Sequence, residues 1–409
     1  MYLYFFIIRI AAFFGHKKAR MLVEGQKETL RQMTINQLQL PHHPIWFHAA
    51  SVGEFEQARP LIERLKQEQP KRPIIVTFFS PSGFELRKHY DKADGVYYLP
   101  FATRANAKKW LDVMQPSMAV FVKYEFWPAY LRELKARAIP TYSICAIFRP
   151  GQLFFKPWGK RHLALLKCFT HIYVQDEASR ALLEKHAITH CSIAGDTRFD
   201  RVSRQATMED SRLMPVQLFI EGCERVIVAG STWPKDEQLL AAYMQQNVLP
   251  TKLILVPHEI DEDHLRFIFN LFRGRLIRYT DLVRRPAVIA NNPFTPEVLL
   301  MDMVGLLSSL YRFGHAAYIG GGFGVGIHNT IEAAAYGIPV LFGPNHTHFR
   351  EAVGLIQAGA AQSIKNADEL TQALETALEQ HTEIGAKAAA YVASETGATD
   401  KIYNEIFTI

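Results

Sequence analysis

The chain has 409 residues, of which 48% are hydrophobic and 21% are charged, a balance typical of folded globular proteins. It excludes a collagen-like or disordered chain, and the length suggests two or three domains at roughly 150 residues each. The net charge of +6 suits anionic partners, but it is too small to indicate nucleic-acid binding. The 4 cysteines form no CxxC pair in the sequence, so a reducing, cytosolic setting fits better than a disulfide framework or a zinc site.

The N-terminal segment 1–14 is apolar except for Arg9, and a basic cluster follows at residues 16–20. Charges that follow the apolar run argue against a signal peptide. As a helix the segment would rise roughly 21 Å, short of the ~30 Å hydrocarbon core of a bilayer. We therefore expect residues 1–20 to form a helix that lies in the membrane interface, and a helix buried against the first domain is the alternative.

From residue 45 onward, short β-branched or aromatic runs alternate with helical patterns, which predicts parallel sheets with crossover helices. The first series of predicted strands is 45–50, 73–79, 118–123, 141–146, 171–175 and 192–194, and the helices between them are 54–68, 82–90, 103–114, 129–138, 157–168 and 177–186. Residues 200–221 show no apolar period and are predicted to be a linker. The second series of strands is 225–230, 252–257, 287–290, 298–301, 316–320 and 339–342.

This pattern predicts two doubly wound α/β domains, 21–205 and 206–409, after the N-terminal helix of 1–20. In such sheets ligands bind outside the carboxyl ends of the strands, and with two domains we expect a cleft between them.

A glycine-rich turn follows the strand predicted at 316–320, and its glycines are Gly320, Gly321, Gly322, Gly324 and Gly326. Glycines let a ligand approach the backbone, and a helix expected to start near Asn329 would offer free amides to a phosphate. Glu332 can accept hydrogen bonds from ribose hydroxyls. Val325 stands where a GxGxxG motif needs its third glycine, so a dinucleotide site of that type is not predicted. A turn with a purely structural role is the alternative.

Polar residues also follow the first two strands of the second series. Ser231 and Thr232 can cap the next helix or bind a phosphate. His258 can contact a base or a phosphate, or it is a solvent-exposed loop histidine. The acidic run 261–263 falls in the first turn of a predicted helix, where acids complement the dipole, and we predict no metal site there.

In the first series, Ser51, Gly53 and Glu54 follow the first strand, in the position where ligands bind. Glu54 either complements the dipole of the next helix or acts as a general base toward an attacking hydroxyl. Glu125 occupies the matching position after the strand predicted at 118–123 and is a second acid candidate.

Taken together, these motifs resemble the 3-deoxy-D-manno-octulosonic acid (Kdo) transferases of lipopolysaccharide assembly. The specific part is Ser51-Val-Gly-Glu54 joined with Glu125-Phe-Trp-Pro128, whereas Gly320-Gly321, His328-Asn329, Glu332 and Gly343-Pro344 are shared with many two-domain glycosyltransferases. Two stretches depart from the family. Pro257-His-Glu-Ile-Asp-Glu stands where Pro-Arg-His-Pro-Glu-Arg is usual, and Cys145-Ala-Ile-Phe-Arg149 stands where Asn-Ala-Arg-Leu-Ser is usual, which leaves Arg149 as a shifted candidate.

The resemblance implies a GT-B fold and inverting transfer of Kdo from CMP-Kdo to a lipid A precursor, lipid IVA, on the cytoplasmic face of the inner membrane, without a metal or cofactor. Glu54 would be the base, Glu125 a second catalytic acid, and Ser51, Gly53 and Arg149 substrate contacts. The nucleotide-binding residues would be Ser231, Thr232, His258, Gly320, Gly321, Gly322, His328, Asn329 and Glu332. The alternatives are a GT-B enzyme that uses a UDP-sugar and a catalytically silent nucleotide-binding adaptor.

Overall fold

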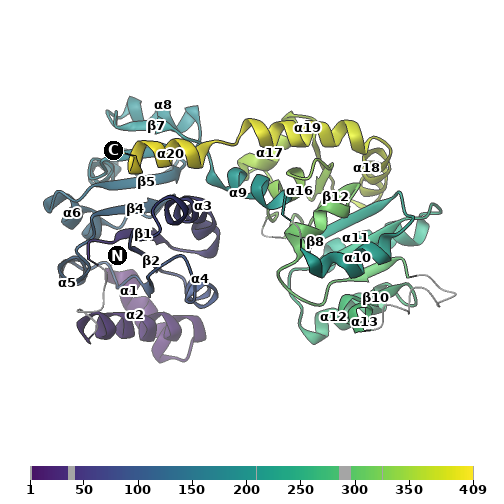
Figure 1. The fold of residues 1–409 in the computed structure, drawn as a ribbon, viewed down its shortest axis with the longest axis horizontal. Coiled ribbons are helices and arrows are strands. Elements are labelled where there is room, and N and C mark those ends of the chain that lie inside the picture. The colour runs from purple at the N-terminus through teal and green to yellow at the C-terminus, as the bar shows by residue number, and fades with distance from the viewer. Residues whose placement is uncertain (1, 36–41, 209, 285–295, 325, 409) are drawn as a thin grey trace. The chain divides into compact units, whose positions relative to one another are not determined.

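The structure is a computed structural model that describes residues 2–35, 42–208, 210–284, 296–324 and 326–408. The chain forms two units (Figure 1). One contains Met1–Asp200 with Thr396–Ile409, and the other contains Arg201–Glu395. Each unit is built on its own seven-stranded parallel sheet, as the alternating pattern predicted.

The sheet of the first unit has the strand order β3-β2-β1-β4-β5-β6-β7. Its strands are β1 (Ile45–Ala49), β2 (Ile74–Phe78), β3 (Gly95–Tyr98), β4 (Met118–Val122), β5 (Thr141–Ala146), β6 (His171–Val174) and β7 (Cys191–Ile193). Strands β1 and β2 are buried along their whole length because helices cover both faces of the sheet.

The helices of this unit connect the strands and add an N-terminal pair. They are α1 (Tyr2–Phe13), α2 (Lys17–Ile35), α3 (Val52–Glu68), α4 (Pro81–Arg87), α5 (Arg104–Met114), α6 (Pro128–Ala136), α7 (Lys160–Leu166) and α8 (Glu177–Lys185), with short 3-10 turns at Leu153–Phe155 and Pro157–Gly159. The last helix of the chain, α20 (Ala398–Phe407), returns to pack on α3.

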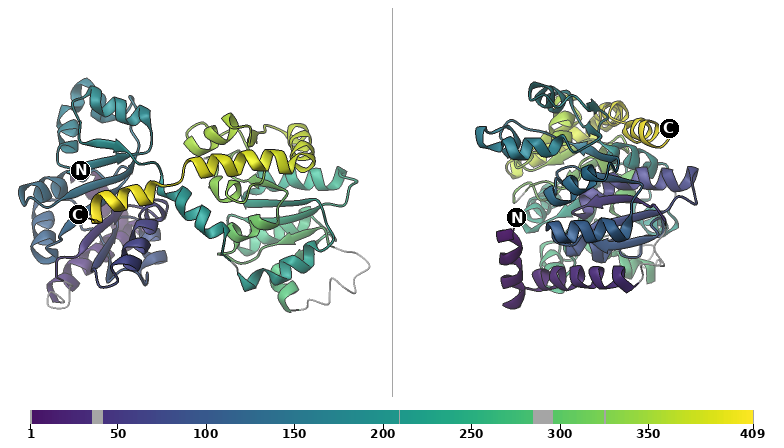
Figure 2. Two further views of the ribbon diagram at one scale, coloured as in Figure 1. Left: turned by 45° about the horizontal axis from the view of Figure 1, so that its top comes forward. Right: turned by 90° about the vertical axis from the view of Figure 1, so that its left-hand side faces the viewer.

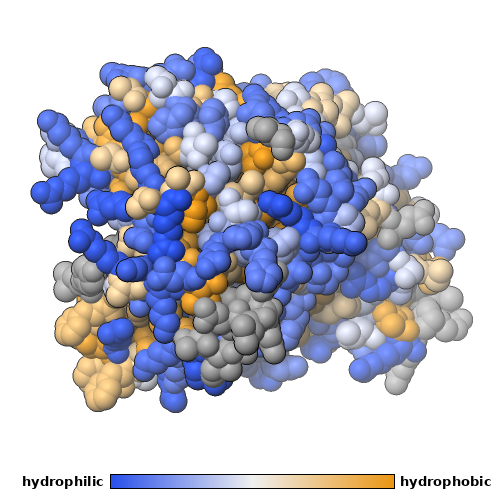
Figure 3. Space-filling view, turned by 60° about the vertical axis from the view of Figure 1, so that its left-hand side comes forward, coloured by the Kyte–Doolittle hydropathy of each residue, from blue (hydrophilic) through white to orange (hydrophobic). Residues whose placement is uncertain are grey.

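Helix α1 lies crosswise to α2, as the right-hand view of Figure 2 shows. It contacts the core through Phe5, which is 5% exposed and lies 4.3 Å from the ring of Phe101. Phe6 and Phe13 point outward and are 60% and 86% exposed. Figure 3 shows an apolar patch at the lower left, on the side where α1 lies. Within the described ranges, each helix is too short or too polar to cross a bilayer.

The sheet of the second unit has the order β10-β11-β9-β8-β12-β13-β14. Its strands are β8 (Val226–Thr232), β9 (Lys252–Pro257), β10 (Leu276–Arg278), β11 (Val298–Leu300), β12 (Ala316–Ile319), β13 (Val340–Phe342) and β14 (Ala361–Ser363). Its helices are α10 (Met214–Ile220), α11 (Pro234–Gln246), α12 (Glu262–Leu271), α13 (Tyr279–Arg284), α15 (Leu307–Leu310), α16 (Ile331–Ala334), α17 (Arg350–Gln357), α18 (Ala367–Glu379) and α19 (His381–Ser394).

The predicted linker at 200–221 is wrong. This stretch holds the end of α9 (Thr197–Ala206), a 3-10 turn at Ser211–Leu213 and helix α10. The buried apolar residues of these helices are few and three apart, and they form the pairs Phe199/Val202 and Val216/Phe219. Three-residue spacing puts each pair on one helix face, which is enough to bury it. The strand predicted at 287–290 lies outside the described residues.

The boundary between the units also differs from the predicted division at 205/206. It falls at 200/201, inside α9, and the final 14 residues belong to the first unit. The carboxylate of Asp200 fixes this return, because it accepts hydrogen bonds from the backbone N–H of Gly397 and of Thr399 at 2.6 and 2.7 Å. Tyr403 then packs beneath the Arg64 guanidinium, 4.3 Å from the ring centroid. Such a long-range contact leaves no local signal in the sequence.

The strand orders place one topological switch point in each sheet. In the first unit the strand order reverses at β1, which lies between β2 and β4. In the second unit it reverses at β8, which lies between β9 and β12. At a switch point, the connections that follow two neighbouring strands run to opposite faces of the sheet. A crevice therefore opens outside the carboxyl ends of these two strands. The residues that follow β1 and β4, and those that follow β8 and β12, therefore lie where such sheets bind ligands.

Candidate active site

Glu54 begins helix α3 at the switch point of the first unit. Ser51 is the N-cap, and its hydroxyl oxygen accepts the backbone N–H of Glu54 at 3.4 Å. The Glu54 carboxylate turns back toward the strand and accepts the N–H of Ala50 at 2.5 Å. The first contact is an N-cap hydrogen bond, and the second reaches the residue before the N-cap, so Glu54 does stabilise the helix start. Gly53 leaves open space beside it, because a Cβ built there meets nothing within 4 Å.

The carboxyl group of Glu54 binds its proton more tightly than an exposed glutamate. Burial and the negative charge of Glu125 raise its pKa from 4.5 to about 7, against the opposing effects of the Ala50 amide and the Lys123 ammonium. A carboxylate with a pKa near neutral pH can be ionised and still take up a proton, which is what general-base catalysis requires. The structure therefore gives Glu54 chemistry that helix capping does not need.

Glu125 lies after β4, the neighbour of β1, and is 9% exposed. Its Oε2 atom accepts the indole N–H of Trp127 at 2.5 Å and lies 3.0 Å from Nε2 of His48. His48 is fully buried in β1. Glu125 is thus held inside the sheet edge by two ring nitrogens, whereas Glu54 is half-buried and is held by backbone amides of its own loop.

Arg149 reaches the same region from the loop after β5. It is exposed, and its charge opposes the rise that burial causes in the pKa of Tyr124. The charge of Glu54 acts on the same phenol. Arg149 and Glu54 therefore both lie within electrostatic reach of Tyr124.

The glycine-rich turn of the second unit packs backbone against backbone. A Cβ on Gly320 would lie 2.3 Å from the carbonyl oxygen of Ser231, and one on Gly322 would lie 2.6 Å from Cα of Gly343. Gly321 has a φ of +90°, and its N–H donates to Oδ2 of Asp236 at 2.9 Å. The glycines thus have a structural role, because they let the turn pack closely against the end of β8.

Asp236 anchors that turn from the first turn of α11. It is 1% exposed, and it accepts hydrogen bonds from the Tyr318 hydroxyl at 2.7 Å and from the backbone N–H of Trp233 at 3.0 Å, besides Gly321. Three donors on one buried carboxylate make this a rigid junction between β12, the turn and α11. The junction orients the side chain of Trp233.

Three rings stack at the ends of β8 and β9. The centroids of Trp233 and His258 are 4.8 Å apart, and those of His258 and His328 are 4.3 Å apart. The indole N–H of Trp233 donates to Nε2 of His328 at 3.1 Å. Burial and the neighbouring His258 lower the pKa of His328 to about 4, so this ring is neutral at pH 7 and carries its proton on Nδ1. His328 therefore presents an N–H donor beside the turn.

A cavity of about 310 Å³ adjoins this stack. It is lined by Trp233, Pro234, Lys235, Asp236, Gly321, Phe323 and Gly324. An aromatic wall and the Lys235 cation form a site that suits an anionic ligand with a planar or sugar ring.

The other residues predicted to bind the nucleotide differ in the hydrogen bonds that their polar atoms already make. The Thr232 hydroxyl donates to Oε1 of buried Glu237 at 2.9 Å, so it faces inward. Ser231 has a left-handed φ of 53°, Asn329 accepts the N–H of Ile331 at 3.2 Å, and Glu332 pairs with Arg201 at 3.2 Å. Ser231 and His328 are thus better placed for a ligand than Thr232.

Sequence reasoning overlooked His48 and the roles of Trp233 and Asp236. A histidine between Phe47 and Ala49 in a wholly buried strand is a signal in itself, since a buried polar ring needs partners. The partners of His48, however, come from β2 and from the loop after β4, and only the strand order reveals them.

Comparison with known proteins finds similarity to one family over much of the first unit. The family model of 3-deoxy-D-manno-octulosonic-acid transferase (kdotransferase) matches residues 17–201. Curated Kdo transferases are similar over most of the chain. The Rickettsia prowazekii protein is 26% identical over 345 residues, which is 82% of this chain and 72% of that protein. The Aquifex aeolicus protein is 27% identical over 347 residues, which is 83% of this chain and 87% of that protein.

Solved structures share the fold. UDP-GlcNAc 2-epimerase from Neisseria meningitidis, bound to UDP-GlcNAc, aligns with a TM-score of 0.62 at 16% identity, over 90% of this chain and 100% of that one. Anabaena Alr3699/HepE in complex with UDP aligns with a TM-score of 0.55 at 13% identity, over 90% and 100%. At this identity the likeness concerns the fold alone, two Rossmann-like domains as in GT-B enzymes. Through its first unit and its curated relatives, the chain is a glycosyltransferase homologous to the Kdo transferases.

Proposed function

We propose that the enzyme transfers Kdo from CMP-Kdo to a lipid A precursor, with inversion at the anomeric carbon and Glu54 as the base. The observation that carries the proposal is the environment of Glu54. In the region that matches the Kdo transferase model, this half-buried carboxyl group sits at the switch point and has a pKa of about 7.

The reaction follows from that position. The ionised carboxylate takes the proton of an acceptor hydroxyl, and the hydroxyl oxygen attacks the anomeric carbon of Kdo. The bond from that carbon to the phosphate oxygen of CMP breaks, and its electron pair leaves with the phosphate. One displacement of this kind inverts the configuration. Fixed donors can stabilise the departing negative charge.

The second unit supplies such donors. The Nδ1–H of His328 and the hydroxyl of Ser231 suit the phosphate, and the stacked rings of Trp233 and His258 suit the base or the sugar. Glu332 suits the ribose once its ion pair with Arg201 is broken. A UDP-sugar is the alternative donor, and competition between CMP and UDP in a binding titration separates the two.

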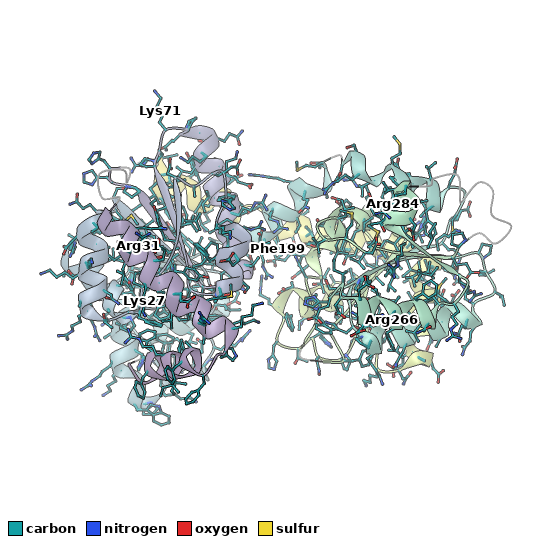
Figure 4. All side chains as sticks on the ribbon, turned by 90° about the horizontal axis from the view of Figure 1, so that it is seen from below. Lys27, Arg31, Lys71, Phe199, Arg266 and Arg284 are labelled. Atoms are coloured by element: carbon teal, nitrogen blue, oxygen red, sulfur yellow. The ribbon has the colours of Figure 1, made fainter. Side chains whose placement is uncertain are left out.

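We also propose that α1 and α2 hold the enzyme on the cytoplasmic leaflet of the inner membrane, where a lipid acceptor is anchored. Phe13 and Phe14, at the end of α1, are 86% and 80% exposed. Lys27 and Arg31 lie one turn apart on α2 (Figure 4). Aromatic side chains beside cations are typical of segments that lie in an anionic membrane interface.

A cavity of about 550 Å³ supports this arrangement. Its lining includes Arg9, Phe13, Arg20 and Lys27, so three cations and an aromatic ring surround a space of headgroup size. Glu24 offsets Arg20, with which it pairs at 2.8 Å.

The activity is tested by mixing the enzyme with CMP-Kdo and a tetraacylated lipid A precursor and following product mass. The expected result is a gain of one or more Kdo units, which Glu54→Gln abolishes while CMP-Kdo still binds. Full turnover by Glu54→Gln, or no product from the wild type on an intact acceptor, would contradict the proposal.

The membrane proposal has a separate test. Co-sedimentation with vesicles of anionic phospholipid should fall strongly for the double variant Phe13→Ser/Phe14→Ser, whose side chains lie outside the core. Val248→Ser is the matched control, because Val248 is 93% exposed in the second unit. Equal sedimentation of the double variant and the wild type would exclude this surface as the contact.

A further inference from the structure

A turn that follows β5 carries an exposed tryptophan. After the strand ends at Ala146, the chain forms the 3-10 turns Leu153–Phe155 and Pro157–Gly159 before α7 begins. Residues 153–161 are called the Trp158 turn below. Trp158 is 74% exposed and Leu153 is 44% exposed, and the proposed reaction uses neither side chain.

The Trp158 turn is rigidly built although its tip is exposed. Beneath the tip, the ring of Phe154 packs on that of Phe126, with the centroids 5.1 Å apart. A Cβ on Gly159 would lie 1.8 Å from the carbonyl oxygen of Leu153, so the chain can approach itself this closely only at a glycine. The packing under the turn therefore enforces the outward position of Trp158.

Positive charge surrounds the exposed indole. Lys160 and Arg161 are exposed, Lys156 is half-buried, and within the described ranges none of the three forms an ion pair. Between Glu133 and Asp176 the chain has no acidic residue and seven basic ones, which are Lys135, Arg137, Arg149, Lys156, Lys160, Arg161 and Lys167.

The acidic residues that follow this stretch are already engaged. Asp176 caps α8 by accepting the backbone N–H of Ser179 at 2.7 Å, and Glu177 pairs with Arg180 at 2.7 Å. The charge of the Trp158 turn is thus not neutralised by these neighbours. Indole rings prefer the interfacial layer of a bilayer, and lysine and arginine are attracted to anionic phospholipid. The turn combines both features.

The Trp158 turn also lies close to the proposed active site. Phe126 in the loop after β4 contacts the turn through Phe154, and the next residue, Trp127, stacks on Phe5 of α1 with the centroids 6.4 Å apart. The loop that carries Glu125 therefore contacts both α1 and the turn. A surface that binds these two segments together would lie next to that loop.

We propose that the Trp158 turn is a second membrane contact of the first unit. Trp158 and Leu153 enter the interfacial layer, and the cations of the turn bind the headgroups of anionic phospholipids. Two separate contacts fix the orientation of the unit on a bilayer, which one contact does not, and they present the loop after β4 to a lipid acceptor. The inference rests on the proposed function for the membrane location, but its test depends neither on Kdo transfer nor on α1.

Co-sedimentation of the full-length protein with vesicles tests the two kinds of side chain separately. Each cation near an anionic surface contributes roughly fivefold in affinity, so Lys160→Gln/Arg161→Gln should bind vesicles of phosphatidylcholine and phosphatidylglycerol about 25-fold more weakly than the wild type. With vesicles of phosphatidylcholine alone, this double variant should lose no affinity. Trp158→Ser should weaken binding to both kinds of vesicle.

Arg266→Gln/Arg273→Gln is the matched control, because it removes the same charge from exposed positions of the second unit. Quenching of tryptophan fluorescence by brominated phospholipid is an independent measurement. Trp46 and Trp110 are fully buried, so the quenching seen in the wild type should fall strongly in Trp158→Phe. Equal quenching of these two proteins, or an equal loss of binding in the control and the turn variant, would overturn the inference.

Other outcomes identify other partners. If the turn variants sediment with vesicles as the wild type does but lose their retention on immobilised poly-glutamate, the turn binds an acidic protein and the membrane contact is refuted. If the wild type makes no Kdo product, the proposed function fails, whereas a loss of vesicle binding in Trp158→Ser still supports the turn. If Phe13→Ser/Phe14→Ser binds vesicles fully and Trp158→Ser does not, the contact through α1 is excluded and the turn is retained.

Discussion

Glu54→Gln should make the folded protein more stable at alkaline pH although it removes the base. In the fold the pKa of Glu54 lies at about 7 instead of 4.5, chiefly because the carboxyl is buried. Between these values the folded state holds a proton that the unfolded state has released. Stability therefore falls as the pH rises through this window and stays reduced above pH 7.

The magnitude follows from the size of the rise. One pKa unit corresponds to about 1.4 kcal/mol, so the ionised carboxylate lowers the free energy of unfolding by about 3 kcal/mol above pH 7. Glutamine has no charge to bury and keeps an oxygen that can accept the N–H of Ala50. The variant should gain up to about 3 kcal/mol at pH 8, or about 6–12 °C in the melting temperature of the first unit. Near pH 4, where Glu54 is protonated in the fold, the gain should vanish.

Urea unfolding or calorimetry of the wild type and the variant at pH 5 and pH 8 measures this difference. Glu221→Gln, at an exposed carboxylate, is the control and should give no gain that depends on pH. If Glu54→Gln is equally stable relative to the wild type at both values, the burial of Glu54 has no effect on its proton. The reasoning that makes it a base at neutral pH would then be refuted.

Two further predictions concern the second unit. Gly320→Ala should disrupt the unit or abolish CMP binding in a calorimetric titration, because its Cβ would lie 2.3 Å from the Ser231 carbonyl oxygen. Trp233→Phe keeps a ring in the stack but removes the N–H that His328 accepts, so CMP affinity should fall about tenfold, the effect of one hydrogen bond. Unchanged CMP binding by a folded Gly320→Ala variant, or unchanged affinity in Trp233→Phe, would contradict these assignments.

The sequence was sufficient for the architecture because most strands are short β-branched runs between glycine-rich or proline-rich turns. The strands that escaped prediction, β3, β10 and β14, have three or four residues, and β14 is Ala361–Ser363 with no β-branched residue. A window that short carries little periodicity. Their positions become evident only when the sheet is complete.

The sequence predicted where the two carboxylates of the candidate site lie, but not their different roles. Glu54 and Glu125 both follow predicted strands, and parallel strands bring such residues to one sheet edge. What the two carboxylates do depends on β1 and β4 being neighbours although two strands intervene in the chain. That order puts His48 beside Glu125, and it makes one acid an anchored partner and the other a free base. Spacing along the sequence cannot distinguish these two roles.

Backbone conformation marks the same places independently of any motif. Among the described residues, three non-glycine positions with a left-handed φ lie at the carboxyl ends of strands, and these are Lys123, Cys145 and Ser231. A left-handed non-glycine residue costs of order 1 kcal/mol or more, and it persists where the surrounding structure enforces it. Lys123 ends β4 beside Glu125, and Ser231 lies in β8 against the glycine turn. Each switch point thus combines a strained residue with the groups proposed for catalysis or phosphate binding. Local strain of this kind is expected at functional sites, where the geometry of the side chains matters more than stability.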